Sequence, residues 1–550
     1  MAIVHEAPNV KTEKSGVRPS PQTDETPRVG KKVGADVTAG FLVFLIALPL
    51  CLGIAKASAF PPITGVFTAI IGGILASIFS NSELTIKGPA AGMIAIVAGA
   101  MLDPHWLGHA PLLTEAGFLE TYRFVLAVGV ISGVIQVVLG LAKAGVLTEF
   151  FPMAPVHGLL ASIGFIIISK QSHVMLGHAV DGKASPLQAY IALKDVPFSA
   201  DYKILTIGVT SLAILFSYPW LKARIKPLRY LPAQLIVLLV AIPLGYAFHL
   251  DQKQLVELPD RISDAVVLPD FSQSLTATSF KWVLMFCLVG SLESLLSAKA
   301  IDILDPWKRK TNMNRDMLGV GIANTASAAI GGLPMISEIL RSSANIGNGG
   351  RTRLSNVFHG LFLLLAIVFI GSAIERIPLA ALGAMLVFAG FRLASPKEFA
   401  HMWHLGFEQF LVFVVTVACI VPNGNLLMVG VGMALELIIN FVNGGSIRSL
   451  FKPTWTLTAS ERSDKLQISD SLTFTNWIPL KRRLEKCDAE SVTVDLTSTR
   501  LIDHTVMDKL VQSQREFTAA GRSLSIVGLD RHRAFGHEAT SGRKLASVGA

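Results

Sequence analysis

Two short stretches of the chain combine chemically useful residues with a break in the backbone pattern. The first reads GPAAGMIAIVAGA from Gly88 to Ala100, and the second reads GGLPMISEILRSSANIG from Gly331 to Gly347. Each apolar run that follows the Gly and Pro residues covers about half of a hydrocarbon core roughly 30 Å thick. A helix that begins inside a bilayer presents unpaired N–H groups and a partial positive charge at its amino end. Two such ends facing one cavity predict an anion-binding site.

Small side chains surround the first helix start, and a cation lies inside the second. Ala90, Ala91 and Gly92 allow an anion to approach the backbone closely. Arg341 adds a full positive charge about one turn into the second helix, and a cation at that depth requires a compensating partner. That partner is either the transported anion or Glu338, three residues earlier on the same helix face. We expect the anion to interact with Arg341, and Glu338 to act at a different stage.

A second ionisable candidate lies in the apolar segment KWVLMFCLVGSLESLLSAKA. Gly290, Glu293, Ser294 and Ser297 recur at i, i+3, i+4 and i+7, which gives one narrow polar stripe on a helix. A carboxylate inside a membrane is a functional candidate by default. Glu293 could bind a sodium ion together with the Ser297 hydroxyl, or it could carry a proton. A structural hydrogen bond between two spans is the remaining alternative.

The composition places these motifs in a polytopic α-helical membrane protein. The chain has 550 residues, of which 51% are hydrophobic and 16% charged, and its mean hydropathy is +0.54. The apolar residues form long blocks, whereas residues 1–33 are rich in Pro, Ser and charge and predict a disordered cytoplasmic tail. The net charge of +9 comes mostly from such cytoplasmic segments, so no nucleic-acid partner is expected.

The hydropathy pattern predicts fourteen membrane segments in two sets of seven. The first set is expected at 37–56, 63–80, 90–101, 121–142, 153–170, 203–220 and 230–249. The second set is expected at 277–298, 316–332, 336–346, 354–372, 378–392, 407–421 and 424–443. Because seven is odd and the third member of each set is short, the sets are expected to be inverted repeats, an architecture of secondary transporters. Basic loops place both termini in the cytoplasm.

Catalysis is not expected. The sequence has no grouping of nucleophile, base and orienting residue, no metal-ligand spacing and no nucleotide-binding loop. Its four cysteines lie in separate segments and are expected to be packing residues. The sequence therefore predicts no cofactor, beyond a sodium ion at Glu293 and Ser297 as a coupling ion.

Four strings together resemble the SulP family of inorganic anion transporters. They are FLIALPLCLGIAKASAFPPITGVFTAIIGG, GPAAG, GSLESLLSA and RSSANIGNGGRTRLSN, and the resemblance covers residues 33 to 445. It implies a 7+7 inverted-repeat fold, divided into a core and a gate domain, in a homodimer. It also implies that an anion lies between the third and tenth spans. The substrate-binding residues expected on this basis are Leu50, Ile54, Ala90, Ala91, Gly92, Ile339, Leu340 and Arg341, and the coupling-ion residues are Glu293, Ser297 and Glu338.

The sequence after the membrane segments, residues 452–550, predicts a small α/β domain. KLQISDSLTFTN and SVTVDLTST alternate like strands, DHTVMDKLVQSQREFTAAG is helical, and SLSIVGL predicts another strand. This order resembles the cytoplasmic STAS domain that follows the membrane part of SulP proteins. The transport domain is accordingly expected at 34–445. The STAS domain could also bind a cytoplasmic protein partner.

The residues and the resemblance together predict secondary active transport of a small inorganic anion across the cytoplasmic (inner) membrane. Bicarbonate is the leading substrate and sulfate the next, carried by sodium- or proton-coupled symport. An anion exchanger for chloride, bicarbonate or dicarboxylates and a nucleobase-type carrier of the same fold are the alternatives. A signalling scaffold with a membrane anchor is a weaker alternative, because an anchor has no need of Arg341, Glu293 and two broken helices.

Overall fold

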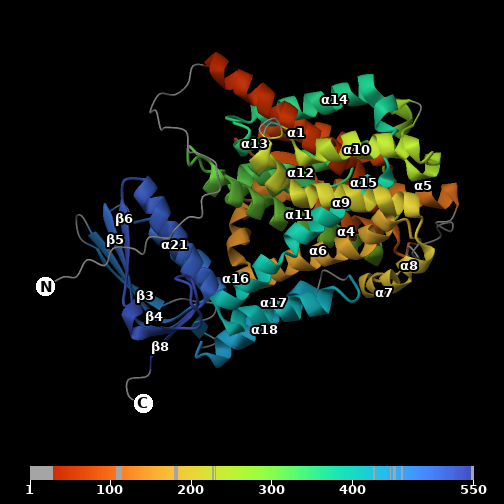
Figure 1. The fold of residues 1–550 in the computed structure, drawn as a ribbon. Helices are drawn as coiled ribbons and strands as arrows, with labels where there is room; N and C mark the ends of the chain where they lie inside the picture. The colour runs from red at the N-terminus through yellow and green to blue at the C-terminus, as the bar shows by residue number, and fades with distance from the viewer. Residues whose placement is uncertain are drawn as a thin grey trace.

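The computed structural model contains a helical body and a C-terminal α/β domain (Figure 1). It describes residues 29–106, 114–178, 184–225, 228, 231–259, 261–424, 428–445, 448–449, 454–459, 463–487 and 489–546. Most of the predicted N-terminal tail lies outside these ranges. Helix α1 already begins at Val29, within the last residues assigned to that tail.

The helical body follows the two predicted sets of segments. The first set comprises α1 (Val29–Ala57), α2 (Pro62–Ile71), α3 (Ser77–Phe79), α4 (Ile94–Met101), α5 (Glu115–Leu141), α6 (Met153–Leu176), α9 (Tyr202–Arg224) and α10 (Ala233–Ala247), with the short α7 (Pro186–Ala192) and α8 (Val196–Ser199) between them. The second set comprises α11 (Ala277–Leu304), α12 (Met313–Ala329), α13 (Ile339–Gly347), α14 (Leu354–Ile374), α15 (Leu379–Leu393), α16 (Pro396–Leu405), α17 (Phe407–Ile420) and α18 (Val429–Val442).

Each predicted membrane segment coincides with one of these helices, and the third member of each set is short. In the described part of the chain, eight helices are long and apolar enough to cross a membrane, and four further apolar helices are shorter. α4 has eight residues and α13 has nine. The polytopic helical fold is therefore confirmed, whereas the count of fourteen crossings stays a prediction.

One boundary differs from the prediction in an informative way. The second short segment was expected to be helical from residue 336, but β2 (Met335–Glu338) occupies its first residues and α13 starts only at Ile339. β2 pairs antiparallel with β1 (Ile86–Pro89), which directly precedes the first short helix. The Gly and Pro residues predict a break in the helix. They do not predict a strand, because the hydrogen-bonding partner of each strand lies in the other repeat.

The helices pack in two groups that correspond to the expected core and gate domains. In the first group α5 packs against α11 and α12, and α1 packs against α2 and α14. In the second group α6 packs against α9, α15 and α17. Glycines allow the close approach of α5 and α12: a Cβ on Gly133 would lie 2.6 Å from the Thr325 nitrogen. The two short helices belong to the first group, because α4 and α13 both contact α11.

The C-terminal domain is the expected α/β unit and has more elements than the sequence predicted. Its sheet has the order β3 (Thr454–Ala459), β4 (Ser463–Leu472), β5 (Ser491–Ile502), β8 (Arg543–Leu545) and β7 (His532–Ala534), and β6 (Ser523–Val527) also pairs with β5. β5 is parallel to β4 and β6. The helices α20 (Trp477–Glu485) and α21 (His504–Ala519) contribute Trp477 and Leu510 to the apolar core. This architecture fits a STAS domain.

The C-terminal domain contacts the helical body through a buried charge cluster. The Glu149 carboxylate pairs with Lys299 of α11, Lys481 of α20 and Lys509 of α21. Burial raises the pKa of Glu149, but the three ammonium groups outweigh it and lower that pKa to about 2. The Thr505 hydroxyl also accepts a hydrogen bond of 3.1 Å from the N–H of Met153, at the start of α6. The domain therefore contacts both helix groups.

Candidate anion-binding site at the crossing of two half-helices

The centre of the core group is a two-stranded sheet from which both half-helices start. β1 and β2 are almost completely buried, and their register pairs Ile86 with Glu338 and Pro89 with Met335. The first half-helix begins with a 3-10 turn at Ala91 and continues as α4, and the second begins directly after Glu338. The predicted meeting of two helix starts is therefore present.

Polar side chains from neighbouring helices complete the hydrogen bonding of these strands. Asn324 of α12 accepts from the Met335 N–H at 2.6 Å and donates to the Met335 carbonyl at 3.2 Å. The Ser294 hydroxyl of α11 accepts from the Ser337 N–H at 3.1 Å. On the outer edge of β1, Ser342 and Asn356 accept from backbone N–H groups. Non-helical backbone inside a membrane is stable only when satisfied in this way, so these side chains hold both helix starts in position.

Two carboxylates lie at the start of the first half-helix. A Cβ on Gly92 would lie 2.1 Å from Glu293 Oε1, so this carboxylate packs directly on the glycine backbone. Glu338 directly precedes α13, and its carboxylate lies close enough to Glu293 to interact with it electrostatically. Glu293 Oε2 and Glu338 Oε1 are buried, and neither has a hydrogen-bond partner in the described part of the chain. The helix start predicted to bind an anion is thus already facing two acidic side chains.

Arg341 lies beside β1. Its side chain is almost completely buried, and Nη2 donates to the carbonyl of Pro89 at 3.4 Å. Nη1 lies against Gly88, where an added Cβ would be 2.5 Å away, and Nε and Nη1 have no hydrogen-bond partners among the described residues. His359 of α14 is also close enough to interact electrostatically with this guanidinium, and both of its ring nitrogens are unpartnered as well. Arg341 thus supplies positive charge next to the first helix start.

The other predicted residues are distributed around this centre. Leu50, Ile54 and Ala90 belong to one buried apolar cluster on α1 and the first half-helix. Ile339, the first residue of α13, is 41% exposed, and Leu340 beside it is half-buried. The structure therefore brings the predicted lining residues to the two helix starts.

Two of the three predicted coupling residues, Glu293 and Ser297, share helix α11, and the third, Glu338, directly precedes α13. Ser297 is buried on α11, one turn after Glu293. Within the described ranges, no group of three or more His, Cys, Asp and Glu side chains could hold a metal ion. The orphaned Glu293 Oε2 fits a monovalent cation or a proton as its partner. That Glu293 binds either of them stays a prediction.

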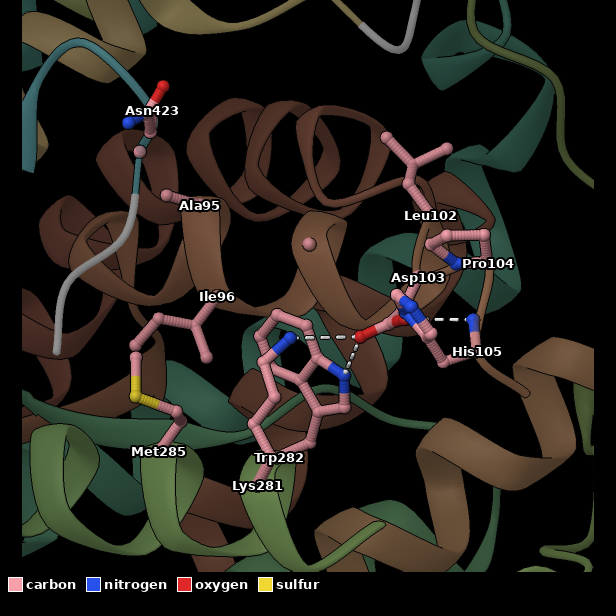
Figure 2. A pocket seen from close by; sticks show the side chains of 12 residues that line it. Ala95, Ile96, Leu102, Asp103, Pro104, His105, Lys281, Trp282, Met285 and Asn423 are labelled. Carbon is pink, nitrogen blue, oxygen red and sulfur yellow. Dashed lines mark hydrogen bonds and ion pairs between the residues drawn. The ribbon is translucent and has the colours of Figure 1, made fainter. Parts of the chain in front are cut away.

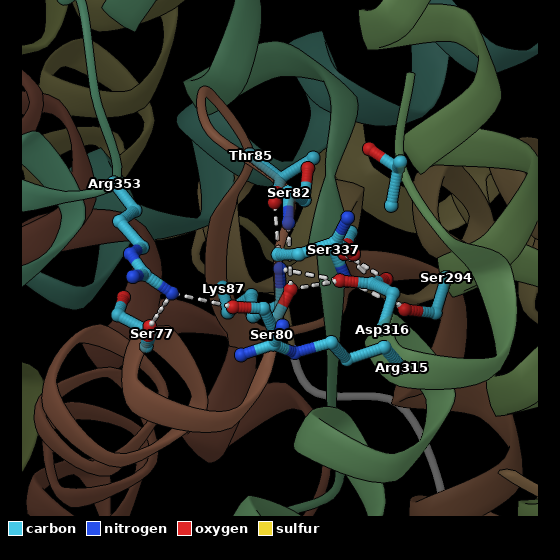
Figure 3. Close-up of polar contacts among 12 residues, drawn as sticks. Ser77, Ser80, Ser82, Thr85, Lys87, Ser294, Arg315, Asp316, Ser337 and Arg353 are labelled. Atoms are coloured by element: carbon cyan, nitrogen blue, oxygen red, sulfur yellow. Dashed lines mark hydrogen bonds and ion pairs between the residues drawn. The ribbon is translucent and has the colours of Figure 1, made fainter. Parts of the chain in front are cut away.

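Sequence reasoning missed a second buried charge cluster that contacts the same strands (Figure 3). Lys87 Nζ lies 3.0 Å from Asp316 Oδ1 and donates to the Thr85 hydroxyl at 2.6 Å. Ser80 and Ser337 donate to the Asp316 carboxylate at 2.5 and 3.4 Å. Both charged side chains are at most 2% exposed. A signal was available, because Lys87 directly precedes the GPAAG motif and Asp316 opens the predicted ninth span.

A cavity of about 370 Å³ lies at the far end of the first half-helix (Figure 2). Asp103, just after α4, accepts hydrogen bonds from Lys281 Nζ at 3.0 Å and from Trp282 Nε1 at 2.9 Å. Burial raises the pKa of Asp103, but hydrogen bonds from His105 and Lys281 lower it to about 2. The ionised Asp103 therefore ties the end of α4 to the beginning of α11. The loop residue Asn423 of the gate group also lines this cavity.

A buried pair of crossing half-helices in a polytopic helical protein defines the class of secondary transporters. Comparison with known proteins identifies a family within this class. Residues 34–416 match the model of the sulfate permease family, so the chain belongs to that family. It is a multi-pass membrane transporter and not an enzyme.

Relatives and solved structures agree with this assignment. "Putative sulfate transporter YvdB" of Bacillus subtilis is 28% identical over 74% of this chain and 73% of its own length. "Bicarbonate transporter BicA" of Picosynechococcus is 22% identical over 80% of this chain and 75% of its own length. The solved transmembrane domain of a cyanobacterial BicA superposes with a TM-score of 0.60 at 21% identity, covering 74% of this chain and 97% of that one. A structure of SLC26A9 superposes with a TM-score of 0.65 at 15% sequence identity, covering 91% of this chain and 85% of that one.

Proposed function

We propose that this chain carries a small inorganic anion across the cytoplasmic membrane by cation-coupled symport. The observation that carries the proposal is the meeting of two half-helix starts with Arg341 beside them and Glu293 packed on Gly92. The partial charges of the helix starts and the guanidinium favour an anion. Glu293 retains a buried oxygen without a partner in the described structure, which supports a role in holding the coupling cation.

Bicarbonate is the leading substrate of this proposal, with sulfate next. The expected lining side chains Leu50, Ile54 and Ala90 are small or apolar and offer no hydrogen-bond donor. Recognition would therefore depend on backbone N–H groups and on charge, which suits a small oxyanion. The names of the relatives support the same two anions, since one is described as a sulfate transporter and another as a bicarbonate transporter.

Coupling follows from the direction of net transport. A negative-inside membrane potential opposes anion entry by about 2.3 kcal/mol per charge per 100 mV. Accumulation therefore needs a co-transported cation or an exchanged anion. Glu293 and Ser297 on one face of α11, with Glu338 near Glu293, are the residues we assign to the coupling ion, either sodium or a proton.

The test is uptake into proteoliposomes that contain the purified full-length chain. Radiolabelled bicarbonate, sulfate and uracil are each supplied with a sodium gradient, with a proton gradient and with neither. The proposal expects bicarbonate or sulfate uptake that an imposed cation gradient drives uphill. Anion uptake that depends only on an anion trapped inside would favour exchange, and uptake of uracil would favour a nucleobase-type carrier.

We also propose a membrane location, a topology and an oligomeric state for the protein. We expect it in the inner membrane with both termini in the cytoplasm, as a homodimer. The STAS-like domain is expected to face the cytoplasm, where it could bind a protein partner.

A further inference from the structure

Two pairs of an acid and an amide join the neighbouring helices α17 and α18 of the gate group (Figure 1). At the end of the contact, the Asn443 amide donates to Glu408 Oε1 at 2.8 Å, and both side chains are partly exposed. Deeper in the contact, Gln409 Nε2 donates to Glu436 Oε1 at 3.0 Å. Gln409 is 6% exposed and Glu436 1% exposed. The two pairs therefore have the same chemistry and differ in their access to water.

The buried pair leaves one oxygen of each side chain unsatisfied. Glu436 Oε2 and Gln409 Oε1 are buried and have no hydrogen-bond partner in the described part of the chain, whereas Glu408 and Asn443 have no such atom. When Glu436 is ionised, both oxygens are acceptors, so neither can satisfy the other. Protonation makes the carboxyl group a donor, and the amide it already contacts supplies an acceptor. One proton therefore satisfies both oxygens.

The surroundings of Glu436 favour the neutral acid. The charged groups near enough to interact with it are Glu408 of α17 and Asp503 of the C-terminal domain, and both are acidic. On α6, the other helix of the body that packs against α18, His157 is bonded to Glu398 of α16 instead. A carboxylate buried without a countercharge takes up a proton rather than remaining ionised.

A metal ion fits this pair poorly. Hard cations such as calcium and magnesium take about six or more oxygen ligands, and the pair offers two free oxygens. Among the residues that the structure describes, no group of three or more His, Cys, Asp and Glu side chains could hold a metal ion. The shared partner of the two oxygens is therefore better supplied by a proton.

We propose that Glu436 is a proton-binding site of the gate group, protonated at neutral pH and paired with Gln409 through two hydrogen bonds. The Gln409 amide donates to one carboxyl oxygen, and the other carboxyl oxygen donates its proton to the Gln409 carbonyl. Loss of the proton to water at alkaline pH removes the second bond and leaves a buried charge between α17 and α18. The site lies outside the core group that contains Glu293, so the inference does not depend on the proposed symport.

Infrared spectroscopy of the purified full-length protein measures this proton directly, because a carboxylic acid and a carboxylate absorb at different frequencies. At pH 7, we expect a carboxylic-acid C=O band in the wild type that is lost in Glu436→Gln, so that the difference between the two spectra isolates this one acid. The band should be present both with and without sodium. Gln409→Leu should shift the band to higher frequency, because the acid loses its hydrogen-bond partner.

Glu408→Gln is the matched control, because Glu408 makes the same kind of bond at the partly exposed end of the contact. It should leave the carboxylic-acid band of the wild type unchanged. The inference is overturned if Glu436→Gln removes no such band, or if Glu408→Gln removes the same band. A band that sodium abolishes would assign the two oxygens to a metal ion and overturn it as well. Failure of Glu436→Gln to fold would also overturn it, because an amide replaces a neutral acid at nearly constant size and still donates to Gln409.

Discussion

Two buried charge clusters contact the same pair of strands and differ in how well they are satisfied. In the Lys87 cluster, the ammonium and the Asp316 carboxylate are paired with each other and with hydroxyl groups. In the Glu293 cluster, oxygens of Glu293 and Glu338 and nitrogens of Arg341 are buried without partners among the described residues. Unsatisfied buried charge is costly, so it persists where a ligand completes it. The comparison favours a structural role for the first cluster and supports the ligand-binding role that we propose for the second.

Breaking the satisfied cluster should give the largest effect, and it should be on folding. Lys87→Met leaves Asp316 buried without its cation, which costs about 3–5 kcal/mol. We expect a strong loss of monodisperse protein in size-exclusion chromatography and a lower melting temperature. Lys87→Met combined with Asp316→Leu should recover much of the loss, because two apolar residues leave no unpaired charge. A stable Lys87→Met protein with impaired transport would instead place Lys87 in the transport machinery.

Breaking the unsatisfied cluster should affect transport more than folding. Arg341→Ala removes a positive charge beside the first helix start, and the protein should still insert and purify. A unit charge about 5 Å away at an effective dielectric of about 20 is worth roughly 3 kcal/mol. Anion uptake by folded protein should therefore fall by about a hundredfold. Wild-type uptake by a well-folded Arg341→Ala protein would remove Arg341 from the site.

Gly92 allows a sharper test of the packing between Glu293 and the first half-helix. The added methyl group of Gly92→Ala would lie 2.1 Å from Glu293 Oε1, so the carboxylate has to move. We expect anion uptake to fall by about tenfold, with a changed dependence on the cation gradient. Gly430→Ala is the control, because a Cβ there meets no atom within 4 Å. Equal uptake by the two variants would mean that transport does not depend on the present position of the Glu293 carboxylate.

The smallest effect is expected at the junction with the C-terminal domain. The folded-state pKa of Glu149 is about 2, below its ordinary value of 4.5, so its contribution to stability is complete above pH 4.5 and is lost as the pH falls toward 2. Glu149→Gln should therefore lower the melting temperature at neutral pH by a few degrees, with a much smaller difference in acid. Thermal scans over pH measure this, and the preference between bicarbonate and sulfate should not change. A changed preference would connect this junction to the anion site.

The contrast between the two clusters also explains what could be predicted from the sequence. Gly88 and Gly331 mark breaks in apolar runs, and Glu293 and Arg341 are charges inside apolar segments, so the half-helices and these residues follow from local pattern. The pairing of β1 with β2 does not follow from local pattern, because each strand finds its backbone hydrogen-bond partner in the other repeat. The packing of Glu293 on Gly92 also joins the two repeats, and the order of residues in the chain cannot specify it.

The central claim is that the unsatisfied cluster couples anion movement to a cation, and Glu293→Gln tests it most directly. Uptake of radiolabelled bicarbonate is measured in proteoliposomes with an imposed sodium or proton gradient, for the wild type and for Glu293→Gln. The account predicts that the variant still binds the anion but no longer accumulates it against a gradient, because the carboxylate that holds the coupling cation is gone. Concentrative uptake with unchanged cation dependence in Glu293→Gln would contradict the account and leave Glu293 a structural residue.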